Sequence, residues 1–132
     1  MTLTGGDDLN IEINGSTVCT DYDQFDVDGI VTLGGADLVL SFTYTPANGT
    51  TYTIIDNDGG DAVIGMFSQG TSMTSGCYTF NINYAGGSGN DVVLTVTGPV
   101  LNTTTNLAYC TIQDAINDPL TIDCLLYTSR CV

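Results

Sequence analysis

The chain has 132 residues with fifteen acidic side chains and a single basic one, Arg130, so its formal net charge is −14. Such a surface repels phosphate, which argues against nucleic acids and anionic lipid headgroups as partners. The absence of His and Lys removes the usual catalytic bases and Schiff-base groups. Apolar residues still make up 42% of the chain, which indicates a folded core rather than a disordered chain.

Alternation of apolar and polar residues predicts most elements of the first hundred residues. Half-buried strands show this period-two pattern, and turn-forming Gly, Asn and Asp separate the stretches that carry it. We expect about seven short strands of this kind. They lie in LNIEI (9–13), DVDGIVTL (26–33), LVLSFTY (38–44), TYTIID (51–56), AVIGMF (62–67), YTFNINY (78–84) and DVVLTVT (91–97).

Two all-β architectures use many short strands joined by tight corners. One is a β-sandwich with mostly antiparallel pairing, and the other is a parallel β-solenoid (β-helix), in which each strand stacks on the previous turn of the coil. Thr, Asn and Gly are abundant, and two glycine corners, TLGGA (32–36) and YAGGSG (84–89), precede strands. These features favour the parallel β-solenoid for residues 1–98, with the β-sandwich as the alternative.

The pattern changes after residue 98, where we expect a linker over 99–108. Apolar side chains then recur at helical spacing, at Ile112, Ala115 and Ile116. Thr111 can serve as the N-cap and Asp114 as the carboxylate of a capping box, while Pro119 stops the helix. The sequence predicts one short capping helix near residues 111–117, docked on the open end of a sheet stack.

Five cysteines are present, without CxxC spacing, so they predict neither a zinc site nor an evident disulfide framework. We interpret Cys19 and Cys77 as buried or incidental thiols. Residues 124–132, CLLYTSRCV, hold the only basic residue and differ from everything before them. We expect this tail to be non-native, because it resembles peptides translated from sequencing-adapter DNA.

Residues 5–97 resemble the autotransporter-associated β-strand repeat found in passenger regions of bacterial surface proteins. The resemblance implies an extracellular β-solenoid with a structural or adhesive role. Its partners would be neighbouring rungs of the parent chain, and a surface glycan or host-cell molecule where the segment is adhesive. The matching stretches are GGDDLNIEINGSTV (5–18), TDYDQFDVDGIVTLGGADLVLSF (20–42), TYTIIDNDGGDAVIGMF (51–67) and FNINYAGGSGNDVVLTV (80–96).

The stretch YCTIQDAINDPLTID (109–123) is similar to the opening of right-handed parallel β-helix domains of the pectate-lyase-like class. In that class a short amphipathic helix caps the first coil. The coils that should follow are missing here, so we expect residues 109–123 to be the start of a second, truncated unit.

Calcium is the one cofactor that the motifs suggest. Gly86, Gly87, Gly89 and Asp91 fit the calcium-binding nonapeptide G-G-x-G-x-D-x-U-x, although a complete site needs a second turn beside it. Two other clusters offer oxygen ligands: Asp56, Asn57, Asp58 and Asp61 in DNDGGD, and Asp21, Asp23, Asp26 and Asp28 in DYDQFDVDG. Neither cluster fits an EF-hand loop, and the alternative is that these residues only form soluble turns.

Enzymatic chemistry has little support. Without His or Lys, only a pair of Asp carboxylates acting as a glycosidase remains, and there is no Trp on which a sugar ring could stack. A stripe of Tyr44, Tyr52, Tyr78 and Tyr84 could bind carbohydrate. For Tyr44, Tyr78 and Tyr84, which share the apolar face with Phe42 and Phe80, core packing is the favoured role.

We therefore expect a non-catalytic structural or adhesive segment of a secreted or cell-surface bacterial protein. No run approaches the roughly eighteen apolar residues of a membrane helix. The alternatives are a fragment of a carbohydrate-active β-helix enzyme, or a free-standing carbohydrate- or calcium-binding β-sandwich.

Overall fold

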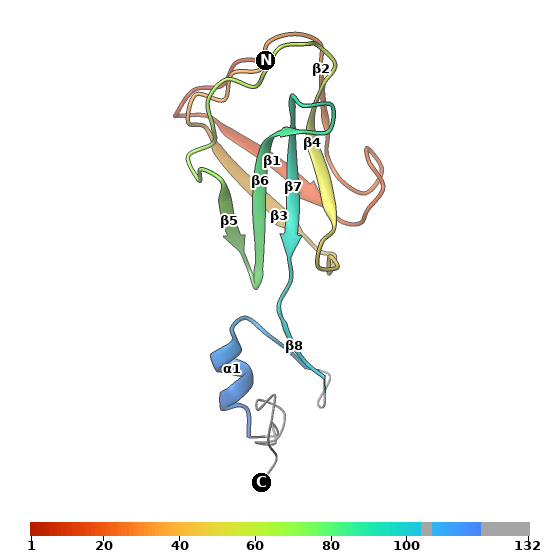
Figure 1. Cartoon of the computed structure of the whole chain (residues 1–132), viewed down its shortest axis with the longest axis vertical. Helices are drawn as coiled ribbons and strands as arrows, with labels where there is room; N and C mark the ends of the chain where they lie inside the picture. Colours follow the sequence, from red (N-terminus) through yellow and green to blue (C-terminus); the bar gives the residue numbers. More distant parts are fainter. Residues whose placement is uncertain (104–106, 120–132) are drawn as a thin grey trace.

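The computed structural model describes residues 1–103 and 107–119, and within them it contains nine strands and one short helix (Figure 1). No helix in these two ranges is long and apolar enough to cross a membrane. The elements are β1 (Asp8–Ile13), β2 (Phe25–Val27), β3 (Asp37–Phe42), β4 (Thr51–Asn57), β5 (Ser72–Ser75), β6 (Tyr78–Gly86), β7 (Asp91–Thr97), β8 (Val100–Asn102), β9 (Leu107–Tyr109) and α1 (Ile112–Asn117).

The first seven strands form two sheets. β1 and β3 pair in parallel as a two-stranded sheet, and they cross behind β6 and β7 in Figure 1. The other sheet has the order β2-β4-β7-β6-β5, in which only β2 and β4 are parallel. β8 and β9 form a separate antiparallel hairpin below this body.

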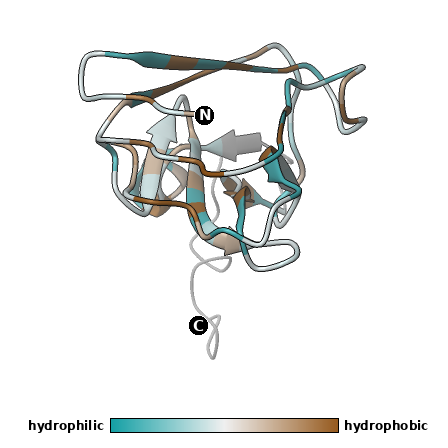
Figure 2. Cartoon of the chain, turned by 90° about the horizontal axis from the view of Figure 1, so that it is seen from above, coloured by the Kyte–Doolittle hydropathy of each residue, from teal (hydrophilic) through white to brown (hydrophobic). Residues whose placement is uncertain are grey.

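The core lies between the two sheets and follows the alternation of the strands. In β1, Leu9, Ile11 and Ile13 are buried while the residues between them are exposed, and brown and teal segments alternate along the strands in Figure 2. From the larger sheet, Phe80 and Leu94 are fully buried and belong to the same cluster. The predicted inward faces of the 9–13, 78–84 and 91–97 stretches are therefore confirmed.

The prediction of a parallel β-solenoid is wrong, and the structure fits the alternative, a β-sandwich-like fold. Parallel strands require a long crossover, whereas antiparallel strands can be joined by a tight turn. Only four residues, 87–90, separate the paired Gly86 and Asp91, so β6 and β7 must be antiparallel. β5 and β6 pair in the same way across the corner between Ser75 and Tyr78. The parallel pairs arise only where a long circuit separates the strands, as between β1 and β3.

Several strands differ from the predictions. DVDGIVTL forms β2 only at its start and AVIGMF forms no strand, because their central residues Thr32 and Ile64 make isolated bridges instead of ladders. β5 went unpredicted, since the sequence SMTS lacks apolar alternation. β8 and β9 occupy part of the stretch that we expected to be a linker.

The predicted helix and its cap are confirmed. Thr111 precedes the helix with extended backbone, and its hydroxyl accepts a hydrogen bond from the Asp114 amide at 3.1 Å. The helix contacts β8 and β9 rather than the end of a coil, so its expected role as a solenoid cap falls with the solenoid. Ala115 is buried, while Ile112 remains 64% exposed. Residues 120–132, which include the expected tail, lie outside the described residues.

Candidate functional site

The two predicted calcium motifs meet at one end of the body. The turn 56–61 begins in the last two residues of β4, the turn 86–91 joins β6 to β7, and β4 pairs with β7. We call this pair of turns the double corner. The turn 56–61 is thus the second turn that a calcium nonapeptide needs beside it.

Asp91 holds the double corner together from inside. Its carboxylate is only 4% exposed, and its Oδ1 accepts a hydrogen bond from the Asn57 amide at 3.0 Å. Its Oδ2 accepts one from the Ser88 amide, also at 3.0 Å. The Gly89 amide closes the same turn onto the Gly86 carbonyl at 2.7 Å. These bonds account for Asp91 as the residue that closes the turn and joins it to β4.

The glycine at position 87 is required by this arrangement. Gly87 has a φ of +51°, and a Cβ built there would lie 1.8 Å from Oδ2 of Asp91. A side chain at this position would therefore displace the carboxylate that closes the turn. The local geometry explains the glycine-rich motif without an ion.

Two asparagines, Asn57 and Asn90, complete the corner through their side-chain amides. Asn90 is 7% exposed, and its amide donates to the carbonyls of Asn57, at 2.9 Å, and Gly59. The Asn57 side chain in turn donates to the Asp61 carbonyl at 2.8 Å. Each asparagine precedes or follows an aspartate in a glycine-rich turn, which is the sequence signal that could have identified them.

A set of four aspartates lies in β2 and β4 or directly after them, and two of the four also belong to the turn 56–61 of the double corner. β2 and β4 pair in parallel with Asp26 opposite Asp56, and the Asp58 amide donates to the Val27 carbonyl at 3.0 Å. We call Asp26, Asp28, Asp56 and Asp58 the acidic ladder. The charges of Asp26 and Asp56, followed by smaller contributions that include Asp28, raise the pKa of the Asp58 carboxyl above its ordinary value.

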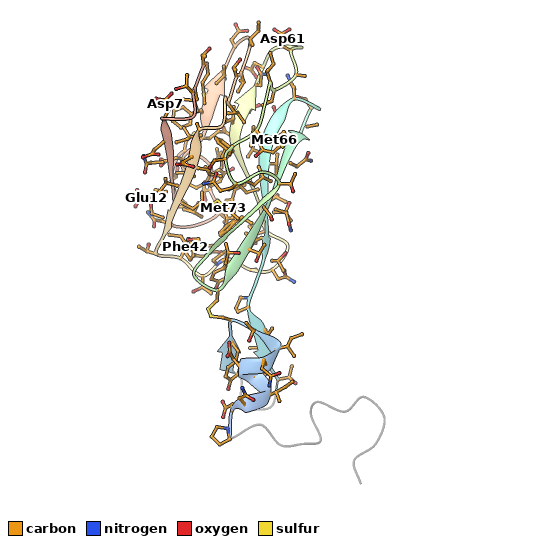
Figure 3. The ribbon with its side chains drawn as sticks, turned by 90° about the vertical axis from the view of Figure 1, so that its left-hand side faces the viewer. Asp7, Glu12, Phe42, Asp61, Met66 and Met73 are labelled. Atoms are coloured by element: carbon orange, nitrogen blue, oxygen red, sulfur yellow. A yellow bond between two sulfur atoms is a disulfide. The ribbon has the colours of Figure 1, made fainter. Side chains whose placement is uncertain are left out.

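Of the remaining predicted site residues, Asp21 and Asp23 lie apart from the ladder. Asp21 accepts a hydrogen bond from the Thr17 amide at 3.0 Å, and hydrogen bonds from Thr17 lower the pKa of its carboxyl. Asp23 accepts one from the Glu12 amide at 2.9 Å. Asp61 lies at the top of the body in Figure 3, in the same turn as Asp58, and its backbone carbonyl accepts the hydrogen bond from the Asn57 side chain. The DYDQFDVDG cluster is therefore divided between two places.

Oxygen ligands of the ladder suit a hard cation such as Ca²⁺. Within residues 1–103 and 107–119, however, no three or more His, Cys, Asp or Glu side chains are arranged as a metal-binding group. Asp58 and Gly59 line a shallow polar depression together with Ser88 and Asn90 of the neighbouring turn. Asp58 is the one ladder carboxylate that lines this depression.

The tyrosines pack into the core rather than forming a sugar-binding stripe. Tyr52 is fully buried and makes an edge-on contact with Tyr22, with ring centroids 5.1 Å apart. Tyr78 packs edge-on against Phe42 at 5.5 Å. The Tyr84 hydroxyl donates to the Gly70 carbonyl at 2.5 Å. The core-packing interpretation is confirmed for Tyr78 and Tyr84, which pack against the core cluster, and Tyr52 belongs to that cluster as well.

A disulfide joins Cys77 to Cys110, so the interpretation of Cys77 as an incidental thiol is wrong. Cys77 lies in the turn between β5 and β6, and Cys110 lies between β9 and α1. The bond therefore ties the hairpin–helix unit to the body, as the yellow link in Figure 3 shows. The two cysteines are 33 residues apart with no recognisable motif, which hid the pairing from sequence reasoning. Cys19 is free and exposed.

Three comparisons with known proteins gave no match. A scan of protein-family models found no match, and searches of curated proteins and of solved structures found no similar protein. The fold itself defines the class: an all-β, β-sandwich-like body of two sheets.

Proposed function

We propose that this chain is a non-catalytic structural module of a secreted or cell-surface protein. The observation that carries the proposal is the Cys77–Cys110 disulfide, which fixes the hairpin–helix unit against the body. Disulfides persist in extracellular and other oxidising compartments and are rare in reducing ones. A small body with an appended unit gains most from such a cross-link.

The polar residues of the double corner support a structural role. The carboxylate of Asp91 and the side-chain amides of Asn57 and Asn90 form hydrogen bonds to backbone groups, and these bonds hold the two turns together. Catalytic carboxylates instead act on a substrate, so side chains committed to the backbone fit scaffold chemistry.

Peptide mapping under non-reducing conditions tests this proposal. The chain would be produced once with export to an oxidising compartment and once in a reducing cytosol. We expect a linked Cys77–Cys110 peptide and a higher melting temperature in the exported protein. Free thiols at both positions in the exported protein would contradict the proposal, as would release of sugar from polysaccharides by the purified chain.

A second candidate function is calcium binding at the acidic ladder. Like charges opposed in register across two strands are unfavourable, and Asp26 stands directly opposite Asp56. A divalent cation between them would remove this repulsion, with a dissociation constant of about 10⁻⁴–10⁻³ M for an extracellular site of this kind.

Calorimetric titration with calcium tests the second candidate. We expect binding heat and a rise in melting temperature, both lost when Asp56 and Asp58 are replaced by Asn. Asp61→Asn is the matched control, because Asp61 neighbours the ladder without belonging to it. No heat at millimolar calcium, or equal losses in both variants, would rule this site out.

A further inference from the structure

The outer edge of β1 is unpaired over part of its length. Odd-numbered residues of β1 direct their peptide groups towards β3, since the Asp37 amide donates to the Asp7 carbonyl at 2.8 Å. The amides and carbonyls of the even-numbered residues therefore point away from β3, as those of Glu12 show. Its amide donates to Oδ2 of Asp23 at 2.9 Å, and its carbonyl accepts from the Asp23 amide at 3.0 Å.

On the N-terminal side of Glu12, no hydrogen bond pairs this edge with another segment in the described part of the chain. The outward amides and carbonyls of Asp8 and Asn10 have no hydrogen-bond partner there. We call these four peptide groups the open edge. Unpaired backbone groups in a strand are a template for another strand.

The opposite edge of the same sheet is closed at the start of β3. The Gln69 side chain accepts from the Leu38 amide at 3.1 Å and donates to the Leu38 carbonyl at 3.2 Å, as a neighbouring strand would. The Ser68 amide also donates to the Ala36 carbonyl at 2.9 Å. The closure is partial, because the outward peptide groups of Leu40 and Phe42 have no hydrogen-bond partner in the described residues. The acidic surroundings of β1 are therefore what distinguishes its open edge from the opposite edge.

Negative charge surrounds the open edge. Asp8 and Glu12 are exposed on the outer face of β1, and Asp8 stands opposite Asp37 of β3. Asp7 and Glu12 lie along the same outer flank of the body in Figure 3. Like charges opposed across a pair are unfavourable, so a cationic side chain placed beside Asp8 would be favoured.

We propose that the open edge of β1 binds an extended polypeptide segment that carries Lys or Arg at alternate positions. The segment adds a strand by hydrogen bonding to the peptide groups of Asp8 and Asn10. Side chains of adjacent strands lie about 5 Å apart, so its outward cationic residues meet Asp8 and Glu12. This partner goes beyond the structural role proposed above.

A second copy of this chain does not fit the same edge. Each copy carries a formal net charge of −14 and has Arg130 as its sole basic residue. Two such edges would bring Asp8 and Glu12 of each copy close together, which is repulsive. The charge therefore selects a foreign, basic strand.

Two peptides of equal charge test the proposal on the full chain. One alternates Lys and Val with blocked ends, and the other alternates Lys and Pro, which lacks the amides that pair with a strand. With backbone amide resonances as the readout, we expect the Lys–Val peptide to shift Asp8 and Asn10. It should bind about tenfold more tightly than the Lys–Pro peptide, because the strand hydrogen bonds are lost in the latter.

Equal binding of the two peptides would mean that charge attraction alone, without strand pairing, causes the binding, and it would overturn the proposal. Shifts centred on the acidic ladder rather than on β1 would overturn it as well. Concentration-dependent dimerisation of the chain through β1, seen by light scattering, would show that the occupant is a second copy instead.

Two variants separate the backbone from the charge. Asn10→Pro removes an outward amide at a strand edge, where proline is tolerated, and should weaken the Lys–Val peptide about tenfold. Asp8→Asn with Glu12→Gln keeps the fold and should remove the preference for Lys–Val over a Glu–Val peptide. If Asn10→Pro unfolds the chain, the charge variant decides alone: an unchanged preference overturns the proposal.

Discussion

At the scale of single residues, Gly87 illustrates how the double corner depends on backbone geometry. Its φ of +51° and the closeness of Oδ2 of Asp91 leave no room for a side chain. We predict that Gly87→Ala destabilises the fold by about 1–3 kcal/mol. Gly60→Ala, in the adjoining turn, is the control, because no atom lies within 4 Å of its Cβ position. Equal urea midpoints for the two variants would contradict this explanation.

Tyr52 buries a hydroxyl that has no hydrogen-bond partner among the described residues. Burial, with smaller effects from Tyr44 and Tyr22, raises the pKa of this phenol above its ordinary value. Removing an unsatisfied buried group is not costly, so Tyr52→Phe should leave the free energy of unfolding unchanged or raise it by up to about 1 kcal/mol. Tyr84→Phe should lower it by about 1 kcal/mol, because that hydroxyl is bonded to Gly70 and Phe67. A loss at Tyr52 as large as that at Tyr84 would contradict the prediction.

Asp58 should make stability depend on pH. Its folded pKa lies above the ordinary 3.8, chiefly because of the charges on Asp26 and Asp56, so the folded state holds its proton more tightly than the unfolded state. The resulting destabilisation is absent below pH 3.8, grows as pH rises through the raised pKa, and is complete at neutral pH. Asp58→Asn should therefore stabilise the chain at neutral pH and lose this advantage in acid. Unfolding curves at both pH values, with Asp61→Asn as the control, measure it; a gain that persists in acid would contradict the assignment.

At the scale of elements, the disulfide governs how the hairpin–helix unit is held. β8, β9 and α1 contact one another, and the Cys77–Cys110 bond fastens them to the turn between β5 and β6. Replacing both cysteines by Ser should cost about 2–4 kcal/mol for a closed loop of this length. Hydrogen exchange should rise first in 99–103 and 107–119, and only later in β6 and β7. Cys19→Ser, at an exposed free thiol, should change neither; a uniform rise in exchange would contradict this division.

Sequence patterns identified some elements because their alternation coincides with burial. The 9–13, 78–84 and 91–97 stretches are such cases, as is the helix, whose cap residues Thr111 and Asp114 are local signals. β5 escaped prediction because its pairing with β6 comes from a turn and not from its own apolar residues. The contacts of Asn57 with Asp91 and of Cys77 with Cys110 join residues 33 or more positions apart, and local patterns carry no such information.

At the scale of the whole molecule, the same alternation of apolar and polar residues is compatible with a β-solenoid and with a β-sandwich. The direction of neighbouring strands depends instead on the length of the connections between them. The parallel pairs β1–β3 and β2–β4 share one core with the antiparallel pairs of β5, β6 and β7. The short corner at 87–90 decides the direction of β6 and β7, and β7 then pairs antiparallel with β4. This closes a sandwich-like body where stacked parallel turns were expected, and it brings the acidic ladder beside the double corner.

Nuclear Overhauser contacts between Hα protons of opposed strands test this fold most directly, because closely spaced Hα pairs occur between antiparallel strands and not between parallel ones. We predict such contacts between β6 and β7, in the register that places Phe80 opposite Val96 and Ile82 opposite Leu94. None should connect β1 with β3. A parallel pattern between β6 and any neighbouring strand would contradict the account.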